Sequence, residues 1–166
     1  MRAALSELVD LLHTEVALYR ELLQAMGRER TAMIRSRLVE LGPAAAEKQT
    51  LIGRLDAVEE RRLELIGRLA DDFGCAPTEL TLSRLARAAP SPYGEAFWRC
   101  RAELSDLLQS LREENRRSEM LCRHSSELLR AMYGVFKGLA ANGSTYHRGG
   151  RVQGVPLNGK LVSGEI

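Results

Sequence analysis

Apolar residues recur every three or four positions from the start of the chain, and this spacing constrains the fold more than any other feature. They are Leu5, Leu8, Leu12, Val16, Tyr19, Leu23, Met26, Ile34, Leu38 and Leu41. Such a period is that of an α-helix and not of a strand. We expect a helix over about residues 3–41. Gly42 and Pro43 should separate it from the next helix, because glycine accepts a left-handed cap and proline fits a first helical turn.

The same period returns in the rest of the chain. The further helices are expected over about residues 43–73, 80–88 and 91–139. Gly74 should end the first of these, and Pro77, Pro90 and Pro92 leave room for only a short helix between the two long ones. The first and last helices would be roughly 60 and 70 Å long at 1.5 Å per residue. Helices of that length need packing partners along most of their length to persist in water.

The composition agrees with a helical protein, since only 5% of residues are aromatic and Leu, Ala, Glu and Arg dominate the chain up to residue 140. We therefore predict an all-α protein. Residues 1–140 should form an elongated antiparallel three-helix bundle that includes a short connector helix. The last helix is longer than the second helix can cover. Its end should expose apolar surface at Leu128, Met132, Val135, Phe136 and Leu139.

The segment over residues 141–166 differs from the rest because it holds six of the fourteen glycines. No helix is expected to run through that spacing. Its apolar residues are too scattered to form a core, so we predict a flexible tail that becomes ordered only on binding. The alternative is a terminal extension without a role, since chain ends are often disordered.

Charge and cysteine content narrow the function. The net charge of +2 lies in residues 142–166, while residues 1–141 carry 21 basic and 21 acidic side chains. A helical region without net positive charge is a poor binder of nucleic acid. Cys75, Cys100 and Cys122 form no CxxC pair and are expected to be reduced thiols packed on apolar surface. No export signal and no run long enough to cross a bilayer is recognised, so we expect a cytoplasmic protein without membrane insertion.

Enzymatic and metal-binding hypotheses rest on few residues. His13 follows Asp10 by three positions, which could serve a metal, but no second pair completes a site. His13 or His124 could accept a phosphoryl group, yet neither is followed by the basic residue and glycine of known histidine phosphotransfer domains. GRVQGVPLNGK lacks the Ser or Thr, the strand and the helix of a phosphate-binding loop. We expect no enzyme, no cofactor and no metal.

The order of the motifs resembles the FlgN-like family of flagellar type III export chaperones. The resemblance is carried by LxxLLxxEVALYRELLQ at 8–24, AAEKQTLIGRL at 45–55, TLSRLA at 81–86, LLQSLREENRRSEMLCRHSSELL at 107–129 and the tail with its tyrosine and glycines. Two departures stand out. Ser118 and Glu119 follow Asn115 where the family often has a second asparagine, and His147 follows the tail tyrosine where glycine is common.

The resemblance implies a chaperone that binds the amphipathic terminal helices of flagellar hook–filament junction proteins, prevents their premature assembly and delivers them to the export gate. For such a function, the uncovered end of the last helix and the apolar residues of the tail are the expected client-binding residues: Leu128, Met132, Val135, Phe136, Leu139, Val152, Val155, Leu157 and Leu161. Tyr146 is implied to dock on the cytoplasmic domain of the gate, or else to pack on the last helix. A self-associating coiled-coil scaffold and a histidine phosphotransfer domain remain as alternatives.

Overall fold

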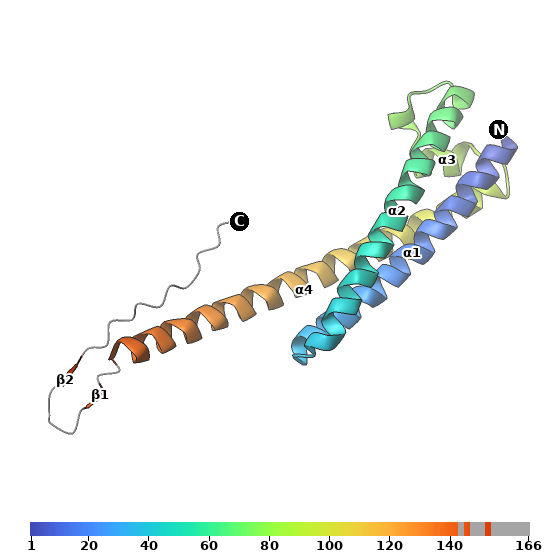
Figure 1. Cartoon of the computed structure of the whole chain (residues 1–166). Helices are drawn as coiled ribbons and strands as arrows, with labels where there is room; N and C mark the ends of the chain where they lie inside the picture. Colours follow the sequence, from blue (N-terminus) through green and yellow to red (C-terminus); the bar gives the residue numbers. More distant parts are fainter. Residues whose placement is uncertain (143–144, 147–151, 154–166) are drawn as a thin grey trace. The chain divides into compact units, whose positions relative to one another are not determined.

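The computed structural model describes residues 1–142, 145–146 and 152–153, and they are almost wholly helical (Figure 1). The elements are α1 (Arg2–Ile34), α2 (Leu38–Phe73), the 3₁₀ helix η1 (Pro77–Glu79), α3 (Leu82–Ala88), α4 (Tyr93–Asn142), β1 (Thr145–Tyr146) and β2 (Val152–Gln153). The predicted all-α class is confirmed. The chain divides inside α4 into two units, Met1–Leu121 and Cys122–Ile166, which are described separately.

In the first unit, ion pairs between the long helices give their directions. Glu7 and Arg28 near opposite ends of α1 meet Arg61 at 2.6 Å and Glu47 at 2.7 Å on α2, so α1 and α2 are antiparallel. The carboxylate of Glu103 accepts a hydrogen bond from Arg20 at 3.0 Å. Further along both helices, Arg30 of α1 pairs with Glu114 of α4. The beginning of α4 therefore runs parallel to α1 and antiparallel to α2, which completes the predicted three-helix bundle.

The turn between α1 and α2 lies at residues 35–37 and not at Gly42 and Pro43, so the predicted boundary was wrong. Ser36 adopts a left-handed φ of 53°. Its N–H donates to the carbonyl of Met33 at 3.1 Å, and the N–H of Arg37 donates to that of Ala32 at 2.9 Å. These two bonds form the Schellman arrangement that ends many helices, although glycine usually occupies the left-handed position.

Pro43 is accommodated inside α2 because it lies near the beginning of that helix. Its missing N–H deprives only the carbonyl of Val39, four residues earlier, of an intrahelical partner. Val39 is 89% exposed, so water can solvate the carbonyl. The Gly-Pro pair is therefore compatible with an unbroken helix at this position.

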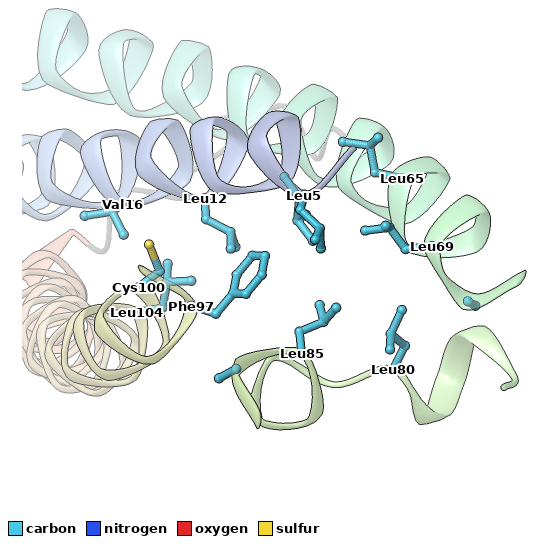
Figure 2. Packing of buried hydrophobic residues seen from close by; sticks show 13 residues of the cluster. Leu5, Leu12, Val16, Leu65, Leu69, Leu80, Leu85, Phe97, Cys100 and Leu104 are labelled. Atoms are coloured by element: carbon cyan, nitrogen blue, oxygen red, sulfur yellow. The ribbon is translucent and has the colours of Figure 1, made fainter. Parts of the chain in front are cut away.

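The larger core cluster joins four elements at the end of the unit that holds α3 (Figure 2). Its buried members are Leu5, Leu8, Leu12 and Val16 of α1, Leu65, Leu69 and Ala70 of α2, Leu80, Leu85 and Ala86 of the connector, and Phe97, Cys100 and Leu104 of α4. Phe97 is fully buried and lies between Leu12 of α1 and Leu85 of α3. The connector therefore closes this end of the bundle.

A second cluster lies nearer the α1–α2 turn and holds the same three long helices together. It comprises Leu18, Leu22, Ala25 and Met26 of α1, Leu51 and Leu55 of α2, and Leu111 of α4. Most of the stripe predicted on the first helix thus lies in a core shared by the three long helices, but Ile34 and Leu38 at its end are 58% and 78% exposed.

Particular residues of the sequence fit the helix ends around the connector. Gly74 ends α2 with a left-handed φ of 62°, as predicted. The side chain of Thr81 caps α3 by accepting a hydrogen bond from the N–H of Arg84 at 3.2 Å. At the start of α4, a Cβ on Gly94 would lie 2.7 Å from the carbonyl oxygen of Ala86. Only glycine allows α3 and α4 to approach this closely.

Within the predicted tail, the structure describes four residues beyond α4. Thr145 pairs with Gln153, and Tyr146 pairs with Val152, as a short antiparallel ladder. The predicted flexibility of residues 141–166 stays a prediction for the remainder, which lies outside the described residues. Cys100 is buried and Cys75 is partly buried. Cys122 is exposed, as is every side chain of α4 from there to residue 138, so its predicted packing on apolar surface was wrong.

Candidate functional site

Every side chain over residues 122–138 of α4 is exposed. Six of them are large and apolar, with exposed fractions between 49% and 66%. They are Leu128, Leu129, Met132, Tyr133, Val135 and Phe136. We call this set the α4 apolar face. Contiguous apolar surface of this kind is rare on a helix that has no partner and usually marks an interaction site.

The α4 apolar face has the amphipathic pattern of a helix that packs against another helix. At 100° per residue its side chains fall within roughly 160° of the circumference. The remaining arc carries Arg123, Glu127, Arg130 and Lys137, three basic side chains and one acidic. Such a helix presents apolar surface to a partner and keeps its charged side in water.

Four of the predicted site residues belong to this face: Leu128, Met132, Val135 and Phe136 are 63%, 49%, 62% and 66% exposed. Their function in binding stays a prediction. The prediction omitted Leu129 and Tyr133, although it included Phe136, which likewise directly follows a residue of the stripe. Apolar residues directly after Leu128 and Met132 were the available signal, and their exposure shows that the face is broader than one stripe.

The structure describes only some of the other predicted site residues. Leu139 lies on α4, while Tyr146 and Val152 pair in the β ladder. Val155, Leu157 and Leu161 lie outside the described residues. The structure therefore brings four predicted side chains together on one helix and leaves the contribution of the tail as a prediction.

The two histidines in the described part of the chain lie on the surface. His13 and His124 are both exposed, and His124 Nδ1 lies 3.6 Å from a carboxylate oxygen of Glu127. In the part of the chain that the structure describes, no group of three His, Cys, Asp or Glu side chains could hold a metal ion.

The first unit also contains a buried carboxyl group, that of Glu15 on α1, which is 6% exposed. Its Oε2 is 3.5 Å from Nε of Arg62 on α2 but has no hydrogen-bond partner. Both residues border a hollow of about 450 Å³, together with Tyr19 and Glu59. Burial raises the pKa of the Glu15 carboxyl above its ordinary value of 4.5, Arg62 lowers it, and Glu59 raises it. Burial also raises the pKa of the Tyr19 hydroxyl, with Glu15 as the next cause.

Glu15→Gln is expected to stabilise the protein at neutral pH, and the gain should depend on pH. A raised native pKa means that folding favours the protonated carboxyl, so the ionised form weakens the fold above that pKa. This loss of stability disappears as pH falls from the pKa of Glu15 in the native state to its pKa in the unfolded state. Arg62 keeps Glu59 as an ion-pair partner at 3.4 Å. Melting temperatures of both proteins from pH 8 to pH 4 would measure the difference.

Glu113→Gln provides a control of opposite sign. Hydrogen bonds from Arg116, and then from Arg117, lower the pKa of the Glu113 carboxyl. The ionised carboxylate therefore stabilises the fold slightly, and this stabilisation should be lost as pH falls and the carboxyl becomes protonated. An unchanged or growing benefit of Glu15→Gln on acidification would show that the buried carboxyl is not the cause.

The long helices are not membrane spans, since none in the described part of the chain has an apolar stretch sufficient to cross a bilayer. A family model described as FlgN protein matches residues 1–154. Searches of curated proteins and of solved structures gave no match. The match extends over the bundle, the α4 apolar face and the β ladder, and the chain belongs to the FlgN family of flagellar export chaperones.

Proposed function

We propose that this chaperone binds the amphipathic terminal helices of flagellar hook–filament junction proteins through the α4 apolar face, keeps them from assembling prematurely and delivers them to the export gate. The observation that carries the proposal is the exposure of six large apolar side chains on one helix. Family membership supports the chaperone role. A cytoplasmic location follows from this proposal, since export begins on that side of the membrane.

The chemistry of the face fits an amphipathic helix as client. Apolar side chains that recur along a helix bind the matching stripe of a second helix, and each buried apolar side chain contributes about 1–3 kcal/mol. A client helix that is covered in this way cannot pack against its own assembly partners. Release would require only that another surface compete for the same stripe, so no ATP-driven step is needed.

Replacing Leu128 and Met132 together with serine is expected to weaken binding of a junction-protein terminal fragment by about 10- to 100-fold, because two apolar side chains no longer bury surface on the client. Helicity should change little, since both side chains are exposed in the free protein. Titration calorimetry would measure the affinity, and circular dichroism would measure the helicity.

Arg130→Gln with Lys137→Gln is the matched control, because these side chains lie on the polar side of the same helix. The control should bind the fragment with an affinity close to that of the unmodified chain. Unfolding of the serine variant would identify these positions as core residues, and equal affinity of all three proteins would place the client elsewhere.

We also propose that Tyr146 docks the loaded chaperone on the cytoplasmic domain of the export gate. It is the only aromatic residue after Phe136. An aromatic side chain with two rotatable bonds can fill a pocket with a small loss of conformational entropy. In the β ladder its backbone pairs with Val152.

Tyr146→Ala should lower affinity for the gate domain by about 10-fold or more, while client affinity and melting temperature stay unchanged. Binding of the purified gate domain to the chaperone–client complex would be measured alongside thermal unfolding. A melting temperature several degrees lower with unchanged gate affinity would instead mean that Tyr146 packs on the chaperone itself.

A further inference from the structure

The hollow beside the buried carboxyl group of the first unit carries more positive than negative charge. It has a volume of about 450 Å³ and is bordered by residues of α1, α2, α3 and α4. Its charged side chains are those of Arg62, Arg101, Arg112, Glu15 and Glu59. Both carboxylates face Arg62, which lies 3.5 Å from Glu15 and 3.4 Å from Glu59. The excess positive charge therefore comes from the two arginines of α4.

Arg101 and Arg112 have no carboxylate as a partner among the described residues. No acidic residue lies three or four positions from either of them on α4, where a helical ion pair would form. Arg116 and Arg117 of the same helix differ, since both pair with Glu113 at 2.9 Å and 3.1 Å. The two guanidinium groups at the hollow are therefore available to an anionic partner.

The two arginines lie on the same side of α4, because the eleven residues between their positions make about three helical turns, or roughly 16 Å. Ser105 and Leu108 lie between them and also border the hollow. Trp98 continues this side of the helix, and its ring lies 5.5 Å from the guanidinium carbon of Arg101. Trp98 is 43% exposed and Leu108 is 36% exposed. The surface thus has apolar side chains between two positive charges.

The buried carboxyl group is a second indication that the hollow is a binding site. Glu15 is 6% exposed and borders the hollow, and its Oε2 has no hydrogen-bond partner. A buried polar atom without a partner lowers the stability of a protein. Such departures from the rules of folding are concentrated at functional sites. The combination of this group with two unpaired arginines favours a binding site over a packing defect.

We propose that this hollow binds an amphipathic helix of a partner protein, one that carries two acidic residues eleven positions apart with apolar side chains between them. The carboxylates pair with Arg101 and Arg112, and an apolar side chain enters beside Leu108. The three-turn spacing of the arginines matches the repeat of a helix, and a groove between helices commonly receives another helix. The site consists of residues of the first unit, so the inference does not depend on client binding by the α4 apolar face.

Two model helices of about 18 residues, long enough to be helical, test the proposal on the full chain. Both have the same leucine stripe, and they carry either Glu or Gln at two positions eleven residues apart. The Glu helix should bind at least about 10-fold more tightly at low salt, because each carboxylate accepts hydrogen bonds from a guanidinium group. Added salt should reduce the difference. Titration calorimetry measures the affinities. The fluorescence of Trp98, the single tryptophan of the chain, should change on binding.

Three variants locate the contact. Arg101→Gln with Arg112→Gln should lower affinity for the Glu helix by about 10-fold, to that of the Gln helix. Arg99→Gln with Arg130→Gln removes the same charge from other exposed positions of α4 and should change neither affinity. Leu108→Ser should weaken both helices, with helicity retained because this side chain is partly open to solvent.

Equal binding of the two model helices, or no binding of either, would overturn the proposal. So would an Arg101 and Arg112 variant that binds the Glu helix as tightly as its control. Loss of binding on replacing Leu128 and Met132 with serine would place the model helices on the α4 apolar face instead. Self-association of the chain, abolished in sedimentation by the changes at Arg101 and Arg112, would assign the hollow to a second copy and also overturn the proposal. None of these outcomes decides client binding, which the junction-protein fragment tests separately.

Discussion

Replacing Phe97 with alanine is expected to lower the free energy of unfolding by about 3–5 kcal/mol and the melting temperature by about 10 °C or more. Phe97 is fully buried and contacts the cluster that joins α1, α2, α3 and α4. Its removal both loses apolar burial and leaves a cavity between Leu12 and Leu85, which lie on either side of it (Figure 2). Thermal and urea-induced unfolding of the variant would measure the loss.

Trp98→Ala is the control for Phe97→Ala. Trp98 is the next residue of α4 and is larger, but it is 43% exposed and contacts Arg101 through its ring at 5.5 Å. The change should therefore cost about 1 kcal/mol or less. Comparable losses in the two variants would mean that the cluster is not organised around Phe97.

Gly94→Ala is the second change with a large expected effect, a loss of about 2–3 kcal/mol in the free energy of unfolding. The new Cβ would lie 2.7 Å from the carbonyl oxygen of Ala86 and 3.1 Å from that of Ala89. Both atoms belong to backbone, so a side-chain rotation cannot relieve the contact. The end of α3 would have to move away from α4, and Leu85 would lose part of its packing in the core.

The same substitution at Gly53 should have the opposite sign. Gly53 is exposed in the middle of α2, and a Cβ there meets nothing within 4 Å. Alanine should stabilise the helix by about 0.5–1 kcal/mol because it loses less backbone entropy on folding. Unfolding curves of the two variants and the unmodified chain decide the matter: a stabilising or neutral Gly94→Ala would show that α3 and α4 can separate without loss.

The spacing of apolar residues was sufficient to predict the long helices, because each buries one face against its neighbours. Their directions were predicted from the connections between them. The end of α2 at Gly74 was also predictable, since glycine supplies a left-handed cap. The α1–α2 turn was not, because Ser36 takes the left-handed conformation that glycine usually holds. The Gly42 and Pro43 pair offered a stronger local signal, but α2 runs through both residues.

The site was predictable in part for a similar reason. A difference in length between α4 and α2, with 50 and 36 residues, correctly indicated which end of α4 has exposed apolar side chains. The length of a helix does not say how much of its circumference is apolar, however. That Leu129 and Tyr133 belong to the α4 apolar face was clear only from the exposed fractions of their side chains. The buried position of Glu15 was also hidden, because a glutamate within a helical stripe usually reaches solvent.

The continuity of α4 across its two parts lowers the entropic cost of forming the helix beyond Leu121. An isolated helix of about 20 residues is marginal in water because its first turn must form before any further residue gains a hydrogen bond. In α4 that nucleation step is already complete, since the helix starts at Tyr93 within the packed bundle. Each residue beyond Leu121 then adds by propagation alone. The bundle thus serves as a template that keeps the end of α4 helical, so binding of a partner helix to the α4 apolar face would lose less conformational entropy than the folding of two free helices onto each other.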